Sequence, residues 1–234
     1  MSIAIVSCVL LGIGFLLGNG VVIGRQENQN DTNFELGIWT SDMKFEQTFI
    51  ASQDNLSRID FAIDSYQPWD SPYLDCRLFE IDTVEKPHTL TYEFISNNIR
   101  EVRYKRINGW LISIHMFNSF SFAPILDSKN KRYLLTIQSP GLKTGGTSIL
   151  LASPGERYEY GNLFVNREKQ KGDLAFRALY RQPRVQLIRQ SFTRLALQKP
   201  FPFSKPAAYY GLFLVYIMVL IGFLGLLTRK KQGP

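Results

Sequence analysis

The sequence predicts a mainly β protein: an antiparallel β-sandwich flanked by an N-terminal and a C-terminal transmembrane helix. The chain of 234 residues carries an apolar run at each end, and runs of about 20 residues are long enough to cross a bilayer. Between the two ends, apolar residues alternate with polar ones over short runs separated by turn-forming residues, which is typical of antiparallel strands. The aromatic content of 13% also favours strands over a helical bundle.

Residues 1–24 are predicted to form the first transmembrane helix, a retained signal anchor. No Lys or Arg precedes the apolar run and no small-x-small cleavage site follows it, which argues against a cleaved signal peptide. Residues 5–8 resemble a lipobox, but the apolar stretch before Cys8 is short for a lipoprotein signal. Glycines in this run either let a second helix approach closely or reflect the glycine content of membrane helices in general. The candidate helix-packing residues are Gly12, Gly14 and Gly18.

Residues 25–39 open with a polar run and are predicted to be a linker, and residues 40–181 are predicted to form the sandwich. Alternating apolar side chains indicate that each sheet buries one face and exposes the other to water. The predicted strands lie around residues 45–50, 56–63, 74–79, 90–94, 110–116, 133–137, 149–151 and 174–178.

A basic segment, residues 182–206, follows the predicted sandwich. We interpret residues 184–199 as a juxtamembrane helix that lies on lipid headgroups, and an irregular basic connector is the alternative. The apolar face of such a helix would consist of Val185, Ile188, Phe192 and Leu195. The candidate membrane-surface residues are Arg184, Arg189, Arg194, Lys199 and Lys205.

Residues 207–228 are predicted to form the second transmembrane helix. Tyr209 and Tyr210 suit an interfacial aromatic belt, and basic residues begin the tail, 229–234. The positive-inside rule puts this tail in the cytoplasm. With two spans, both termini are expected to be cytoplasmic and the sandwich extracytoplasmic.

Three parts of the chain resemble an extracytoplasmic jelly-roll-like domain of bacterial integral membrane proteins: residues 47–51 with 56–60, residues 122–128, and residues 172–177. Such domains are often attached to polytopic glycosyltransferase-like proteins and are similar to carbohydrate-binding modules. The resemblance covers roughly residues 40–180, and its motifs are structural. It implies a jelly-roll-like sandwich fold and a location in the inner membrane of a bacterium, and it implies that a partner would have to supply the polytopic part that this chain lacks.

Residue types for enzyme chemistry are scarce, so we expect no enzyme, no cofactor and no metal site. His88 and His115 are isolated, and the sequence has no His-x-x-x-His or Cys-x-x-Cys pair. The glycine-rich residues 141–146 lie between predicted strands rather than before a helix, so hairpin geometry explains them better than a phosphate loop. Cys8 and Cys76 lie in different regions, and no disulfide is expected.

Four acidic residues beside strands and loops are the remaining candidates for chemistry: Asp60, Asp64, Asp70 and Asp75. Paired carboxylates can serve a glycosidase or bind calcium. Solvated strand and loop acids are the simpler interpretation, and we prefer it.

The loop of residues 67–73 carries Trp69 and Tyr73, which we identify as candidate ligand or partner contacts. Exposed aromatic rings would form a platform on which apolar sugar faces stack. The preferred alternative is a rigid loop whose aromatic rings pack on the sandwich.

The net charge of +7 is concentrated in residues 167–205 and after the last apolar run. Basic residues beside a membrane span indicate anionic lipid headgroups rather than nucleic acid as partners. Two hypotheses follow. The chain is a non-catalytic accessory subunit of a larger membrane complex, either bioenergetic or envelope-assembling, with integral membrane proteins as partners. Alternatively, it is a membrane-tethered carbohydrate-binding module with a glycan as partner.

Overall fold

A computed structural model describes residues 19–28, 34–41, 43–69, 71–82, 91–141, 149–153, 158, 161–197, 199 and 204–230. The chain divides into two compact units, of which one consists of residues 21–181 and the other includes residues 182–234. Most of the predicted first span, with Gly12, Gly14 and Gly18, lies outside the described residues, as do Asp70, His88 and the end of the basic tail.

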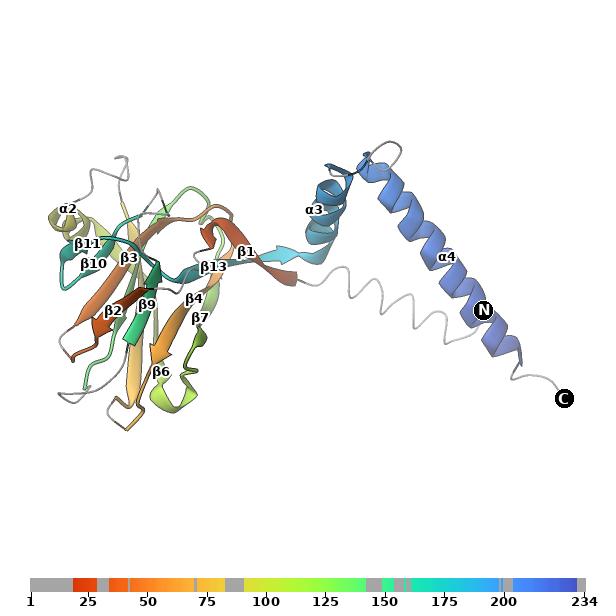
Figure 1. Ribbon diagram of the computed structural model, residues 1–234. Coiled ribbons are helices and arrows are strands. Elements are labelled where there is room, and N and C mark those ends of the chain that lie inside the picture. Colours follow the sequence, from red (N-terminus) through yellow and green to blue (C-terminus); the bar gives the residue numbers. More distant parts are fainter. Residues whose placement is uncertain are drawn as a thin grey trace. The chain divides into compact units, whose positions relative to one another are not determined.

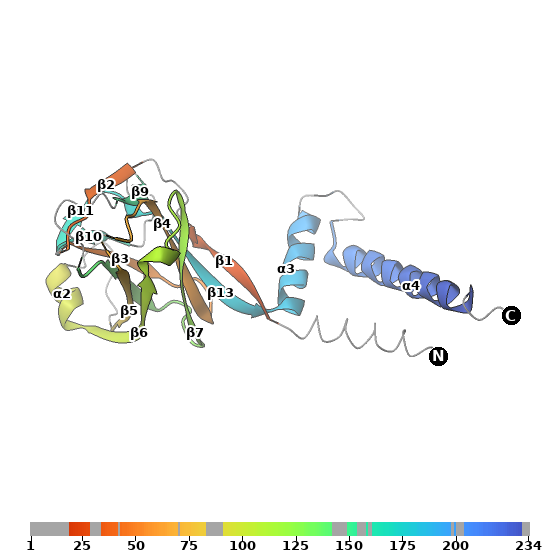
Figure 2. The ribbon, with the colours of Figure 1, turned by 90° about the horizontal axis from the view of Figure 1, so that it is seen from below.

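The first unit is built from two antiparallel sheets, and the strands can be followed in Figure 1 and Figure 2. The central strands of the seven-stranded sheet follow the order β1 (Asn19–Asn28), β13 (Phe176–Pro183), β4 (Leu56–Ser65), β9 (Ile149–Ser153) and β12 (Asp173–Leu174). On this sheet, β2 (Phe34–Ile38) pairs with β9, and β7 (Met116–Ile125) pairs with β4. The six-stranded sheet has the order β11 (Glu168–Gln170), β10 (Leu163–Val165), β3 (Lys44–Ile50), β8 (Arg132–Gln138), β5 (Tyr73–Ile81) and β6 (Ile99–Asn108).

One apolar core joins the inner faces of the two sheets, which makes the unit a β-sandwich. Phe49 of β3 and Phe176 of β13 meet across the core with ring centroids 5.6 Å apart. Tyr133 of β8 packs on the same Phe49 ring, also at 5.6 Å. Cys76 is a free thiol within this core, and burial raises its pKa. The prediction of a mainly β protein with antiparallel sheets is therefore confirmed.

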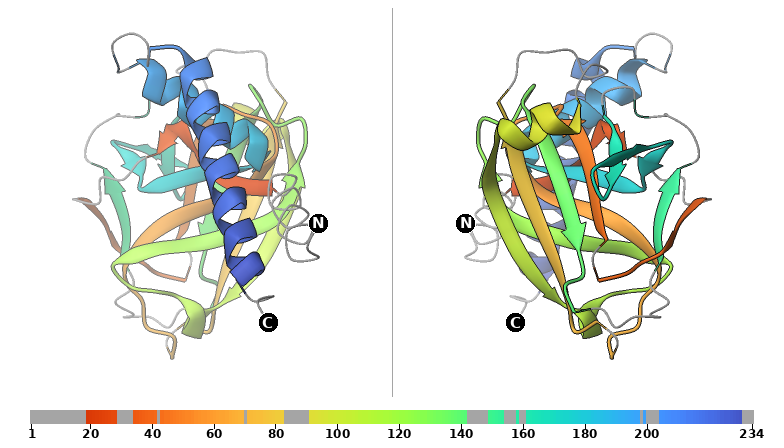
Figure 3. Two further views of the ribbon diagram at one scale, coloured as in Figure 1. Left: turned by 90° about the vertical axis from the view of Figure 1, so that its right-hand side faces the viewer. Right: turned by 90° about the vertical axis from the view of Figure 1, so that its left-hand side faces the viewer.

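A second apolar cluster lies on the face of the six-stranded sheet that points away from the core. Helix α2 (Tyr92–Asn97) lies across one end of this face, as the right-hand view of Figure 3 shows, and its Ile95 packs with Ile81, Leu134 and Phe164. The sequence alternation predicted a strand at residues 90–94, and this prediction is wrong. The side chain of Thr91 accepts a hydrogen bond from the amide of Phe94, and this N-cap starts a helix instead.

Two further segments differ from the sequence-based prediction. Residues 19–28 and 34–38 form strands β1 and β2, where the end of a transmembrane helix and a linker were predicted. The β-branched run at residues 21–23 favours an extended backbone, and β1 lies beside β13 in the seven-stranded sheet.

Residues 110–116 were predicted to be one strand, but the structure breaks them. A 3-10 turn, η2 (Gly109–Leu111), is followed by a bend at His115, whose φ is +55°. Positive φ ends an extended strand, so β7 starts only at Met116. The charged strand β6 was not predicted, because most of its residues are exposed and show no apolar alternation.

The edge strands β6 and β7 are joined by the side chain of Arg103. Its guanidinium donates hydrogen bonds to the carbonyl oxygens of Ala123, at 2.9 Å, and Pro124, at 3.4 Å. Since β6 and β7 belong to different sheets, this contact closes one side of the sandwich.

The second unit contains two helices, α3 (Arg184–Leu197) and α4 (Pro206–Lys230). Within the described part of the chain, α4 is the one helix that is long and apolar enough to cross a membrane, over Pro206–Phe223. Residues 184–197 are helical, as the preferred interpretation expected, and the position of this helix on lipid headgroups stays a prediction. Arg189, Lys199 and Lys205 are exposed and Arg184 is half-buried, while the side chain of Arg194 lies outside the description.

Candidate aromatic binding site

Two loops at one end of the sandwich approach each other closely. One loop joins β4 to β5, and the other joins β6 to β7. The amide of Gly109 donates to the carbonyl oxygen of Pro72 over 2.8 Å. A Cβ atom at position 109 would lie 2.5 Å from the carbonyl oxygen of Ser71, so the close approach requires glycine here.

The first loop is also held from within. The hydroxyl of Tyr66 donates to the carbonyl oxygen of Ser71 over 3.0 Å, and the amide of Ser71 donates to the carbonyl oxygen of Gln67 over 3.1 Å. Burial raises the pKa of Tyr66, so its hydroxyl stays protonated and keeps its donor at neutral pH. The Ser71 hydroxyl also meets that of Ser139.

The second loop has its own side-chain supports. The side-chain oxygen of Asn108 accepts a 3.0 Å hydrogen bond from the amide of Trp110, which caps the turn η2. The Asn118 amide group binds both the N–H and the carbonyl oxygen of Ser113, at 2.7 and 2.8 Å. His115 contacts Asp64 through Nδ1 at 2.9 Å. Both loops are therefore fixed by hydrogen bonds.

These fixed loops present two tryptophans to solvent. Trp69 is 61% exposed and Trp110 is 68% exposed, and their ring centroids lie 6.4 Å apart with planes inclined by 58°. Leu111, beside Trp110, is also exposed. We call Trp69, Trp110 and Leu111 the tryptophan tip. Trp69 thus projects outward rather than packing on the sandwich, and the partner of its ring is Trp110, which the sequence analysis had placed in a strand.

Tyr73, the second predicted contact residue, has different neighbours. Its ring is exposed, and the Arg106 guanidinium lies 5.0 Å from its centroid. Arg106 also forms two hydrogen bonds with the Asp75 carboxylate, at 2.7 and 2.9 Å, and Tyr104 donates to it over 3.1 Å. The hydrogen bond from Arg106 lowers the pKa of Asp75. One face of Tyr73 is therefore covered by a cation.

Of the other predicted acids, Asp60 and Asp64 have separate partners, the partner of Asp64 being His115, and Asp70 lies outside the described residues. Asp60 pairs with Arg58 at 3.0 Å and accepts from the hydroxyl of Ser119 over 2.8 Å. Among the described residues, no group of three His, Cys, Asp or Glu side chains is arranged to hold a metal ion. Asp60 and Asp75 are buried and held in ion pairs, so the interpretation of them as solvated acids is wrong for these two.

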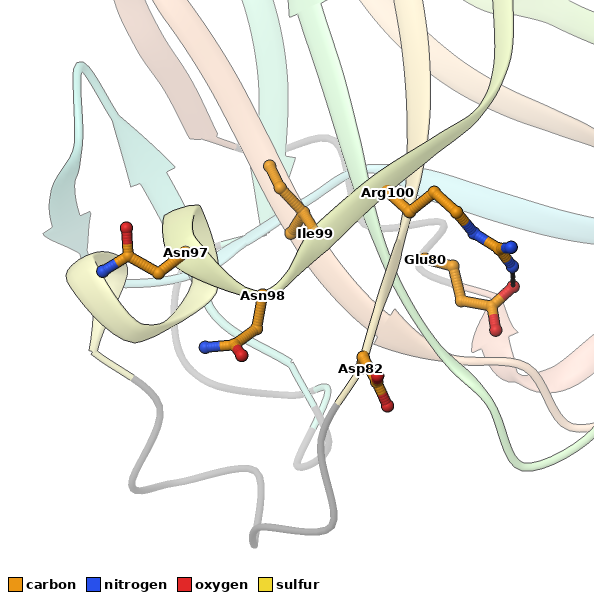
Figure 4. A pocket seen from close by; sticks show the side chains of 6 residues that line it. All are labelled: Glu80, Asp82, Asn97, Asn98, Ile99 and Arg100. Atoms are coloured by element: carbon orange, nitrogen blue, oxygen red, sulfur yellow. Dashed lines mark hydrogen bonds and ion pairs between the residues drawn. The ribbon is translucent and has the colours of Figure 1, made fainter.

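A polar hollow of about 470 Å³ lies elsewhere on the sandwich, between strand β5, strand β6 and the end of α2. Figure 4 shows the Arg100 side chain reaching Glu80 from the neighbouring strand. Glu80 also pairs with Lys131 at 3.3 Å, and Lys131 pairs with Asp127 at 2.6 Å. These charged groups thus bind one another, and the lining, Glu80, Asp82, Asn97, Asn98, Ile99 and Arg100, contains no aromatic ring.

No protein family and no curated protein matches this chain. A similar solved structure contains the cysteine protease and lectin-like domains of Cwp84, a surface layer associated protein of Clostridium difficile, at 10% identity and a TM-score of 0.39. That match covers 60% of this chain and 32% of the other, so this chain spans about a third of that protein's length.

Proposed function

We propose that this chain is a membrane-anchored binding module whose sandwich holds a glycan on the tryptophan tip. The observation that carries the proposal is the exposed Trp69–Trp110 pair on two hydrogen-bonded loops. Water contact is unfavourable for indole rings, and most large aromatic rings of a folded domain are at least partly buried. A ligand with flat apolar faces would cover these rings, and sugar rings have such faces.

The fixed loops also favour binding. Ordering a mobile loop opposes association, and a loop that is already ordered avoids this cost. The contact between Gly109 and Pro72 and the supports from Asn108 and Asn118 hold the backbone of the two loops in place before any ligand arrives.

Glycan-array and calorimetric binding of the full chain in detergent micelles tests the proposal. We expect Trp69→Ala and Trp110→Ala each to weaken binding about fivefold, because a stacked aromatic ring contributes on the order of 1 kcal/mol. Leu126→Ala removes an exposed apolar side chain from the turn after β7 and should leave binding unchanged. Glycan binding that survives the double tryptophan variant would overturn the proposal.

Helix α4 favours a second candidate, an accessory subunit of a larger membrane complex. The helix is apolar around its whole circumference, with charges only at its C-terminal end, and such a helix needs lipid or other membrane helices around it. In this candidate, α4 packs on integral membrane subunits and the sandwich caps the outer face of a bacterial inner-membrane complex. Recovery of only a monomer from mild detergent would count against it, whereas a co-purified membrane protein would support it.

The same topology underlies both candidates. Arg229 and Lys230 at the end of α4 would face the cytoplasm by the positive-inside rule, and the sandwich would then lie outside. Labelling of single introduced cysteines with an impermeant maleimide, at Ser121 and near Thr228, would test this orientation in intact cells. The Ser121 site should react and the Thr228 site should be protected.

A further inference from the structure

Helix α3 has one apolar face with a basic residue at each edge. An α-helix turns by about 100° per residue, which places Val185, Ile188, Phe192 and Leu195 on one side. Arg184 and Arg189 then fall at the two margins of that side. Helices that lie in a membrane surface have this design, because long basic side chains reach up to headgroups while the apolar side faces the acyl chains.

The apolar face of α3 meets the beginning of α4. Phe192 packs on the rings of Tyr209, Tyr210 and Phe213, with centroid distances of 6.0, 5.1 and 6.3 Å. The Tyr209 hydroxyl donates to the carbonyl oxygen of Leu195 over 3.4 Å. Aromatic side chains prefer the level of the headgroups. A span formed by α4 would therefore hold α3 at that level.

The contact with α4 covers only part of the apolar face. Val185 and Leu195 remain 53% and 45% exposed, so an apolar surface is still needed beside them. Helix α3 carries three arginines and no acidic residue. Two more basic residues, Lys199 and Lys205, lie between α3 and the first residue of α4. Positive charges and exposed apolar side chains on the same helix suit a partner surface with negatively charged groups above an apolar layer.

We infer that α3 lies on an anionic phospholipid surface, with Arg184 and Arg189 contacting lipid phosphates and Phe192 fixing the helix to the start of the span. This inference is independent of glycan binding at the tryptophan tip. It concerns how the chain meets the bilayer, and it names negatively charged lipid as the partner.

Hydrogen exchange of the full chain in nanodiscs tests the inference. We expect the amides of residues 186–197 to exchange at least about tenfold more slowly in phosphatidylcholine with phosphatidylglycerol than in phosphatidylcholine alone, since each basic residue near an anionic surface contributes about a fivefold preference. High salt should reduce this difference without any substitution, because it screens the attraction.

The variant Arg184→Gln with Arg189→Gln and Arg194→Gln should lose the difference between the two lipids. Glutamine is a good helix former, so the helix itself is retained. The control variant, Lys105→Gln with Lys129→Gln and Lys171→Gln, removes the same charge from exposed positions of the sandwich and should behave as the unmodified chain does. Equal exchange of the unmodified chain in the two lipids, or an equal loss in the control variant, would overturn the inference.

Discussion

The amide of Gly109 donates a 2.8 Å hydrogen bond to the carbonyl oxygen of Pro72, and this bond joins the two loops that carry Trp69 and Trp110. The two residues lie on either side of a long stretch of chain that contains β5 and β6. The geometry of the tryptophan tip therefore depends on backbone contact between distant segments, and it can be disturbed without touching either indole.

The substitution Gly109→Ala should disturb this contact. Its Cβ would lie 2.5 Å from the carbonyl oxygen of Ser71 and 3.1 Å from the Tyr66 ring, so the loops must separate. We expect a loss of about 2 kcal/mol of unfolding free energy, as for other overpacked sites, and a change in tryptophan fluorescence. Gly211→Ala is the matched control, because a Cβ there meets nothing within 4 Å. An unchanged melting temperature for Gly109→Ala would contradict the geometry.

The ion pair of Asp75 with Arg106 should contribute to the loss of stability of the sandwich at acid pH. The hydrogen bond from Arg106 lowers the pKa of Asp75 in the folded chain. A carboxyl group with a lowered pKa stabilises the fold above its unfolded pKa of about 4, and this stabilisation disappears as the pH falls through the folded value. The melting temperature of Asp75→Asn should therefore fall less than that of the unmodified chain when the pH drops below about 4.

Arg106→Gln provides the matched test of the cause. It removes the guanidinium and leaves the carboxylate, so the pKa of Asp75 should return toward its ordinary value and the same part of the acid dependence should vanish. If the melting temperature depends on pH in the same way in the unmodified chain, in Asp75→Asn and in Arg106→Gln, the pair does not contribute to stability.

A buried polar network should be a sensitive point of stability. The Asp173 carboxylate is 1% exposed, and it accepts hydrogen bonds from the Tyr158 amide at 2.8 Å and from Gln47 Nε2 at 3.3 Å. Asp173→Ala would leave both donors buried without this acceptor, at a cost of about 3 kcal/mol in urea unfolding. Asp173→Asn keeps one acceptor oxygen and should cost less. Equal stability of the two variants would argue against the network.

Phe192 is expected to set the position of α3 on α4. Phe192→Ala removes the ring that meets Tyr209, Tyr210 and Phe213, while Phe192→Leu keeps an apolar side chain. Spin labels at Gln186 and Lys205, introduced as cysteines, should show a broader distance distribution for the alanine variant than for the leucine variant. A distribution that stays narrow in Phe192→Ala would show that the rings do not fix the helix pair.

The sequence predicted strands whose alternate side chains enter the core, but the prediction that each sheet exposes its other face to water is wrong for the central strands. Residues 45–49 of β3 and 132–137 of β8 are buried on both faces. The prediction also failed where a local contact or an edge position decided the structure. Phe45 and Phe49 of β3 and Tyr133 and Leu135 of β8 alternate because the core lies on one side of their sheet. Residues 90–94 alternate too, but the cap from Thr91 bends them into a helix. Strand β6 is an edge strand with charged side chains, so no alternation marked it.

Of the two tryptophans of the candidate site, the sequence indicated Trp69 but not Trp110. The Pro-Trp loop pointed to Trp69, because proline and polar residues around an aromatic ring suggest an exposed loop. Its neighbour Trp110 could not be found in this way, since their contact depends on how β5 and β6 pair, from Tyr73 with Asn108 onward. The sequence Asn108-Gly109 before Trp110 is the one local feature that indicated a turn there.

The contact of Arg103 with Ala123 and Pro124 protects an edge of the sandwich against aggregation. An edge strand with unpaired carbonyl oxygens is a template on which a second chain adds a strand, and repetition of this step produces aggregates. Arg103 occupies two of these oxygens on β7, and Pro124 lacks an amide hydrogen to offer. The charges along β6 would have to lose water before another strand could pair there. The side of the sandwich between β6 and β7 is thus protected against polymerisation into extended sheets.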